Sequence, residues 1–173
     1  MLRHAEKPAQ GLGQLTCRGL NRALALSRLL PARFGKPTAI FAPNPGELKE
    51  DQGHEYNYVR PLATIEPTAI RAGLPVRALW GFREIEPLQE ALLSPAMEDA
   101  TVFVAWEHHL LNKAARAMLV RLGGDPSAVP DWANDDYDTL YVMTVTNDSG
   151  SRTATFRVER QALDALSDAC PGD

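Results

Sequence analysis

The sequence lacks several features that would each define a class of protein. Only two of its 173 residues are cysteine, too few for a disulfide scaffold, and they have no zinc-finger spacing. No apolar run approaches the roughly 18 to 20 residues that a membrane-spanning helix needs. Basic residues are not in excess, because 18 Lys and Arg stand against 22 Asp and Glu, which gives a net charge of -4. General nucleic-acid binders are usually basic, so we expect neither a nucleic acid nor a membrane as a partner.

What is present is the composition of a soluble globular protein. Apolar residues make up 45% and charged residues 23% of the chain, which allows a proper core and excludes global disorder. The length suits one domain, so we expect residues 1–173 to form a single domain. Cys17 and Cys170 either form a bond that ties the tail to the first helix or remain free thiols, and we favour free thiols.

The first residues are unusual, because Arg3 and His4 follow only two apolar residues, Met1 and Leu2. If a strand delivers this pair, most of that strand is absent, so we predict a truncated first strand. An upstream extension should then raise the stability by an amount on the order of a few kcal/mol, if three large side chains become buried. No signal peptide is visible. We therefore expect a cytoplasmic protein, or an exported one if a leader precedes Met1.

The apolar pattern of the first half predicts short strands and helices in alternation. We expect a helix that Thr16 caps and that ends before Pro31, a buried strand over 38–42, a polar loop over 47–58, helical pieces over 61–72, and a short helix over 88–93. Pro67 is acceptable only near the start of a helical turn, and Gly73 ends this region.

The second half contains the clearest strand, at 101–106, which is continuous, β-branched and aromatic. A helix over 107–122 follows it. Residues 140–146 and 153–158, joined by 147–150, read as an antiparallel hairpin, and a last helix is expected over about 160–169. This order predicts an α/β fold, a three-layer α/β/α sandwich with a mixed, mostly parallel sheet.

Two histidines stand where predicted strands end. His4 and His108 each follow a strand, and in open sheets the site lies where strands end and helices begin. Arg3 precedes one of them, and Arg60 follows the polar loop, so it can fold back over the same place. An arginine with two histidines suggests an anion pocket, and phosphate is the common anion that bidentate arginine contacts suit.

These residues resemble the motifs of the histidine phosphatase superfamily, which includes the phosphoglycerate-mutase-like phosphatases. The resemblance rests on Arg3-His4-Ala5-Glu6-Lys7-Pro8, on the helix over 15–30, on the segment from Arg60 to Pro67, and on the strand that leads to Glu107-His108. The four motifs stand in the family's order and cover nearly the whole chain. The resemblance implies a phosphoglycerate-mutase-like fold.

By this resemblance, Arg3, His4, Arg60 and His108 form a phosphate pocket in which His4 attacks phosphorus and forms a phosphohistidine that water hydrolyses. Neighbouring guanidinium charges disfavour protonation of His4, which leaves a neutral nucleophile. Arg3, Arg60 and His108 bind the phosphoryl oxygens. No metal and no cofactor are required. The expected partner is a phosphorylated small molecule or a phosphoprotein.

The general acid is open, because the sequence departs from the family at this point. His109 stands where many members have Gly or Asp, which argues against the acid-phosphatase branch. Glu84 is the candidate acid, with Glu86 and Glu107 as alternatives. Without an acid, only substrates with good leaving groups, such as acyl phosphates, phosphohistidines or aryl phosphates, should turn over quickly.

Other interpretations stay beside this one. Glu107-His108-His109 suggests metal ligation, but adjacent residues on a helix diverge by about 100 degrees, so we expect no shared ion. His54 and the acidic stretch 135–138 read as solvated surface. A non-catalytic phosphate-binding module on the same fold is the alternative function, and a phosphoglycerate mutase is a weaker one because the chain is short.

Overall fold

The computed structural model describes residues 1–148 and 150–172, and these contain one large mixed sheet and one small hairpin. The strands are β1 (Leu2–Arg3), β2 (Ala39–Phe41), β3 (Leu48–Asp51), β4 (His54–Asn57), β5 (Val76–Arg77), β6 (Val102–Trp106), β7 (Thr139–Asp148) and β8 (Ser151–Arg160). The large sheet has the order β5-β2-β6-β1-β7-β8. Neighbours from β5 to β1 are parallel, and β7 and β8 join antiparallel.

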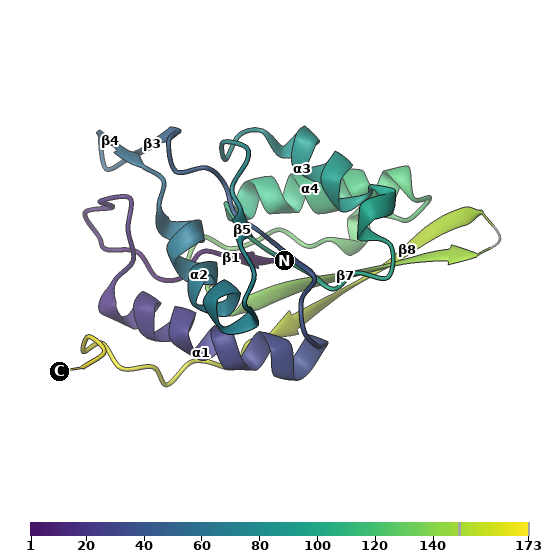
Figure 1. The fold of residues 1–173 in the computed structure, drawn as a ribbon. Helices are drawn as coiled ribbons and strands as arrows, with labels where there is room; N and C mark the ends of the chain where they lie inside the picture. The colour runs from purple at the N-terminus through teal and green to yellow at the C-terminus, as the bar shows by residue number, and fades with distance from the viewer. Residues whose placement is uncertain (149, 173) are drawn as a thin grey trace.

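Helices cover both faces of this sheet (Figure 1). The α-helices of the described chain are α1 (Cys17–Phe34), α2 (Arg60–Ala72), α3 (Ile85–Leu92) and α4 (His108–Arg121), with short 3-10 turns at η1 (Pro95–Met97) and η2 (Pro126–Ala128). Helices α1 and α2 pack on one face and α3 and α4 on the other. The chain is therefore α/β with a helix layer on each side of a mixed sheet, as the alternating pattern predicts.

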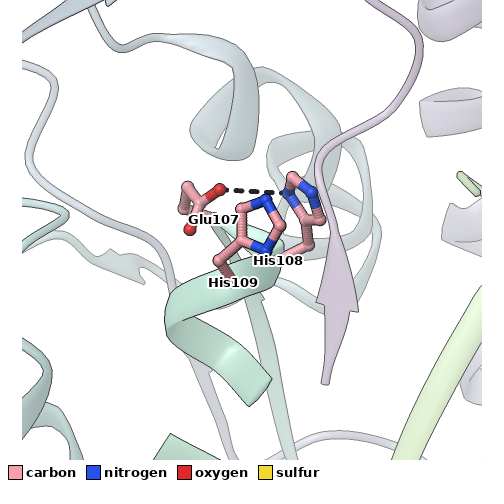
Figure 2. A group of neighbouring side chains, drawn as sticks. All are labelled: Glu107, His108 and His109. Atoms are coloured by element: carbon pink, nitrogen blue, oxygen red, sulfur yellow. Dashed lines mark ion pairs between the residues drawn. The ribbon is translucent and has the colours of Figure 1, made fainter. Parts of the chain in front are cut away.

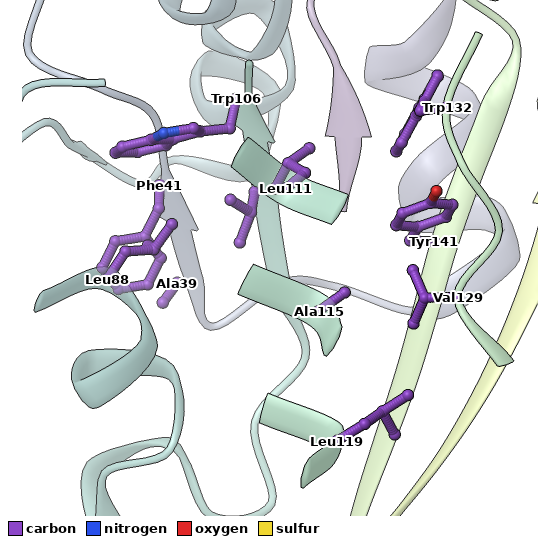
Figure 3. Packing of buried hydrophobic residues seen from close by; sticks show 11 residues of the cluster. Ala39, Phe41, Leu88, Trp106, Leu111, Ala115, Leu119, Val129, Trp132 and Tyr141 are labelled. Atoms are coloured by element: carbon purple, nitrogen blue, oxygen red, sulfur yellow. The ribbon is translucent and has the colours of Figure 1, made fainter. Parts of the chain in front are cut away.

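The position of β6 between two layers of helices explains why its sequence is apolar without interruption. Phe103 and Ala105 pack into the core beneath α1 and α2. Val104 and Trp106 point the other way, into the cluster beneath α3 and α4 that Figure 3 shows. Successive side chains of a strand alternate between faces, so a strand covered on both faces must be apolar at every position.

The strand β1 lies in the middle of the sheet and is very short. Leu2 pairs with Ala105 of β6 on one side and with Leu140 of β7 on the other, and Arg3 pairs with Trp106. His4 continues the pairing by donating its backbone N–H to the Trp106 carbonyl at 3.3 Å. This register brings the ends of β1 and β6, and so His4 and His108, to the same edge of the sheet, as expected.

A cavity of about 650 Å³ lies at the opposite end of β1. Both flanking strands continue there, β6 back to Val102 and β7 on to Asp148, although β1 begins at Leu2. The apolar lining includes Leu30, Phe34, Val102, Val104, Met118 and Met143. Met1 also lines the cavity, and its amino group is buried 2.8 Å from the Tyr141 carbonyl oxygen. The short first strand expected from the sequence thus leaves an open position between two strands.

Several predicted elements are confirmed with small changes of boundary. Thr16 caps α1 by accepting the Gly19 N–H at 3.0 Å. Gly73 ends α2 in the left-handed region, with φ of 69°. The hairpin of β7 and β8 is longer than predicted (Figure 1), and Ser149 in its connection lies outside the described residues. The short predicted helix over 88–93 is α3, which begins three residues earlier, at Ile85.

Two helices tolerate a proline that the sequence analysis treats as a limit. The prediction that α1 ends before Pro31 is wrong, because α1 continues to Phe34. Proline removes only one N–H donor, and the last turn still closes as Gly35 donates to the Pro31 carbonyl at 3.0 Å. Helix α2 is likewise continuous through Pro67 rather than helical in pieces.

The predicted loop over 47–58 is instead the hairpin of β3 and β4. Gln52 and Gly53 both have positive φ, 55° and 79°, as the tight turns that favour hairpins require. The hairpin presents mostly exposed polar side chains, with Asp51 as its buried member. It therefore lacks the apolar alternation that identifies a half-buried strand in a sequence.

The predicted last helix over 160–169 is wrong. Strand β8 runs to Arg160, and the described residues after it, 161–172, contain no helix. Asp138 holds this turn by accepting the backbone N–H groups of Ala162 at 3.2 Å and Leu163 at 3.0 Å.

The preference for free thiols is also wrong, because Cys17 and Cys170 form a disulfide that ties the tail to α1. Among the helices of the described residues, none is both long and apolar enough to cross a bilayer.

Candidate functional site

The geometry around His4 suits a neutral nucleophile. Its Nδ1 lies 2.7 Å from the carbonyl oxygen of Ala5. A carbonyl only accepts hydrogen bonds, so Nδ1 carries the proton and the lone pair stands on Nε2. His4 is 3% exposed. Burial above all, and then the charges of Arg60, Arg3 and His108, hold its pKa well below the ordinary range.

Arg3 and Arg60 are buried beside His4, and each uses only part of its guanidinium within the protein. Arg3 donates through Nη1 to the carbonyls of Asn134 at 2.6 Å and Asp136 at 3.2 Å. Arg60, the first residue of α2, donates through Nη1 to Asp51 Oδ2 at 2.7 Å. The Nε atoms of both arginines are buried without a hydrogen-bond partner. Two buried cationic donors thus remain free for an anion.

Tyr58 and Asp51 belong to this site, although the sequence analysis did not identify them. The Tyr58 ring meets the His4 ring edge-on, with centroids 5.9 Å apart, and the Arg60 guanidinium lies 5.0 Å from its centre. The Tyr58 hydroxyl is buried and has no hydrogen-bond partner. Burial above all, with the Glu107 charge, raises its pKa, so the hydroxyl stays a donor. The hairpin places Asp51 against Arg60, which no local pattern could reveal.

His108 begins α4, and Figure 2 shows its ion pair with Glu107. Its Nδ1 lies 3.0 Å from Glu107 Oε1, and its Nε2 lies 2.9 Å from Asn134 Oδ1. Asn134 Oδ1 is also 3.0 Å from Nε2 of His109. Glu107 is the N-cap of α4 and accepts the Leu110 N–H through Oε2 at 2.9 Å. Glu107 therefore caps the helix and holds the His108 ring by close contact rather than by a hydrogen bond, because Nδ1 has no partner of hydrogen-bond geometry.

The argument that adjacent side chains diverge is wrong for Glu107, His108 and His109. One ligand atom from each lies within 4.8 Å of the others. Glu107 has extended rather than helical backbone angles, with φ of -75° and ψ of 129°, so the helical rotation does not apply to it. The rings of His108 and His109 have centroids 4.0 Å apart. These three residues could hold a metal ion as far as their donor types are concerned.

The candidate general acids differ in place and in charge. Glu84 is exposed and uses Oε2 to accept the Gly81 N–H at 2.7 Å. Glu86 is also exposed. Glu107 is at the site, where burial opposes its ionisation. Its contacts with His108 and the Leu110 N–H, and the charge of Lys49, outweigh this and lower its pKa to about 2. Glu107 is therefore a carboxylate at neutral pH, and the structure gives Glu84 no contact with His4 or His108.

The remaining polar candidates are His54 and the acidic stretch 135–138. His54 is exposed on β4, in agreement with a surface role. The acidic stretch 135–138 is not simply solvated. Asp136 accepts the backbone N–H groups of Asp138 and Thr139, at 2.9 and 3.0 Å, while buried Asp138 pairs with Arg22 at 3.3 Å. These two carboxylates hold the segment that supplies the carbonyls bound by Arg3.

Comparison with known proteins adds a likeness of fold. The chain is similar to a solved structure named "Mycobacterial hydrolase 2", with a TM-score of 0.60 and 16% sequence identity, over 90% of this chain and 87% of that one. No protein-family model matches the sequence. No curated protein matches it either. At this sequence identity the likeness shows a shared fold and nothing more.

Proposed function

We propose that the chain is a metal-independent phosphohydrolase of the phosphoglycerate-mutase-like kind. It would act through a phosphohistidine at His4 on a phosphorylated small molecule or phosphoprotein. The observation that carries the proposal is a buried neutral imidazole beside two arginines whose Nε donors lack partners. The fold neighbour is named a hydrolase, which agrees in reaction class.

The first step transfers the phosphoryl group to the histidine. The lone pair on His4 Nε2 forms the N–P bond as the bond from phosphorus to the leaving oxygen breaks, and the leaving group departs with that electron pair. The imidazolium that forms keeps its proton on Nδ1, which donates it to the Ala5 carbonyl oxygen 2.7 Å away. Arg3 Nε, Arg60 Nε and the Tyr58 hydroxyl stabilise the charge on the equatorial oxygens.

The second step restores the enzyme. Water attacks phosphorus, the N–P bond breaks, its electron pair returns to Nε2, and inorganic phosphate leaves with the proton that water loses. In the structure both ring nitrogens of His108 contact acceptors, Nδ1 Glu107 and Nε2 Asn134, so His108 would bind the same oxygens through Nε2 after the phosphoryl group displaces Asn134. Because Glu84 and Glu86 are exposed and Glu107 is ionised, we expect none of these three candidates to protonate the leaving group. Aryl phosphates, acyl phosphates and phosphohistidines are the substrates that this site suits.

The test is hydrolysis of an aryl phosphate in excess EDTA by the wild type, His4→Ala and His54→Ala. His54 is an exposed histidine on β4 and serves as the matched control. We expect activity in the wild type and His54→Ala only, with an acid-labile phosphoryl label on His4. Equal rates with and without His4 would refute the proposal. Activity that EDTA removes would instead point to the cluster of Glu107, His108 and His109.

A non-catalytic phosphate-binding module is the second candidate. The free Nε donors of Arg3 and Arg60 would bind phosphate in either case. Tight binding of inorganic phosphate by the wild type, without turnover and without labelling of His4, would favour it.

A further inference from the structure

Lys49 is a cation near the site whose contacts, among the described residues, leave its charge available. It lies on β3 and pairs across the hairpin with Tyr56. Asp51, two residues on, shares its face of the strand, and Asp51 contacts Arg60 at 2.7 Å. This face of β3 is therefore directed at the site. The same alternation directs the Lys49 side chain toward the site.

The Lys49 ammonium rests on two aromatic rings rather than on a carboxylate. Its Nζ lies 4.7 Å from the centre of the Phe82 ring and 5.4 Å from that of Tyr58. Within residues 1–148 and 150–172 it makes no hydrogen bond or ion pair. Its neighbour on Phe82, Arg83, is already paired with Glu47. Lys49 thus differs from Arg83, which is paired with Glu47.

Tyr58 links Lys49 to the reacting group. The same ring lies 5.9 Å from the His4 ring centroid and 5.4 Å from Lys49 Nζ. A phosphoryl group on His4 and an anion on Lys49 would therefore both lie close to this one aromatic side chain. Burial and the charges of Arg60 and Arg83 lower the Lys49 pKa, while Glu107 and Asp51 oppose this.

We propose that Lys49 binds a second anionic group of the substrate, so that the enzyme prefers phosphate monoesters that carry another negative charge, such as a carboxylate. This inference rests on the proposed function, because it assumes that the phosphoryl group sits at His4. Lys49 is then a specificity-determining residue and takes no part in bond breaking. A cation that packs on aromatic rings keeps its charge, while contact with the rings holds its aliphatic side chain in place.

The experiment compares two aryl phosphates that differ in one charge, 4-carboxyphenyl phosphate and its neutral amide, 4-carbamoylphenyl phosphate. We expect the wild type to prefer the carboxylate in kcat/KM by about tenfold, the scale of one charge-assisted hydrogen bond. Lys49→Met should remove the preference, so that kcat/KM for the carboxylate falls to the value for the amide. Lys113→Met, at an exposed lysine of α4, is the matched control and should keep the preference.

The experiment distinguishes failure of the Lys49 assignment from failure of the proposed phosphatase activity. Turnover of the amide by Lys49→Met, with the preference retained, would overturn the assignment of Lys49 while leaving the phosphatase intact. If neither compound is hydrolysed, calorimetric binding of the corresponding phosphonates makes the same comparison. A Kd ratio near one for the wild type, or a ratio that Lys49→Met does not change, would overturn the proposal there too.

Discussion

Filling the open position beside β1 should stabilise the protein. The perturbation is a three-residue extension of the type Val-Ile-Val, inserted between a new initiator methionine and Met1. In the observed register Leu2 lies opposite Ala105, so the added residues would lie opposite Phe103, Val102 and the residue before it. A strand residue fills about 160 Å³, from a rise of about 3.3 Å and spacings of about 4.8 and 10 Å. The cavity of about 650 Å³ therefore has room for all three.

The magnitude follows from burial set against ordering. Three apolar side chains each contribute about 1.5 to 3 kcal/mol on burial, and ordering costs about 1.5 kcal/mol per residue. Hydrogen bonds to β6 and β7 add about 1 kcal/mol each. We expect a net gain of about 3 kcal/mol at neutral pH, which corresponds to roughly 6 to 12 °C in Tm for a chain of this size.

The gain should also depend on pH, because the extension replaces a buried amine with an amide. Burial lowers the pKa of the Met1 amino group from 8.0 to about 5. The unfolded chain therefore binds more protons between these values, and the stability of the unextended protein falls as the pH drops from about 8 to 5. Three pKa units correspond to about 4 kcal/mol below pH 5, and the cost is about 1 kcal/mol at pH 7.

Thermal unfolding of three proteins separates the two effects. A Gly-Ser-Gly extension removes the charge but buries no apolar side chain, so it should abolish the pH-dependent part alone. The Val-Ile-Val extension should be more stable than this control at every pH. Equal melting temperatures for the two extensions would refute the view that the cavity is an unfilled strand position. A Gly-Ser-Gly variant that follows the unextended protein between pH 8 and 5 would refute the assignment to the amino group.

The remaining predictions concern the tail and the carboxylates. Cys170→Ser should lower the stability by up to about 5 kcal/mol, because the bond to Cys17 closes a separation of 153 residues, and an unchanged Tm in thermal unfolding would contradict this. Glu107→Gln should reduce kcat for an aryl phosphate by about tenfold or more through loss of the His108 orientation. Glu84→Gln should leave kcat unchanged, and the reverse order of effects would restore Glu84 as the general acid.

The elements that the sequence predicts well are those whose pattern arises from burial. The strand β6 is apolar at every position because both its faces are covered, and α4 follows it with a helical apolar face. The C-terminal segment fails for the opposite reason. Its apolar spacing resembles a helix, but Asp138 and the disulfide hold residues 161–170 in another conformation. Partners distant in sequence decide such segments, and no local pattern contains them.

The residues of the candidate site also fall into those that local pattern predicts and those that depend on the tertiary fold. Arg3, His4 and His108 were identifiable because each stands at the end of a strand, which fixes its place in an open sheet. Lys49 and Tyr58 were not, because their contribution depends on how the β3–β4 hairpin folds over the sheet edge. Residues that strands carry can be placed from sequence order, whereas residues that loops and hairpins bring in require the tertiary structure.

The three buried arginines show why two of them are available to a ligand. Arg22 uses Nε, Nη1 and Nη2 for Glu6, Asp138 and other acceptors, at 2.8 to 3.3 Å. It is a structural cation with no donor to spare. Arg3 and Arg60 are held by Nη1 alone and keep a buried Nε free. An unpaired buried donor lowers stability, so the two Nε donors beside His4 are the ones that a phosphoryl group would satisfy.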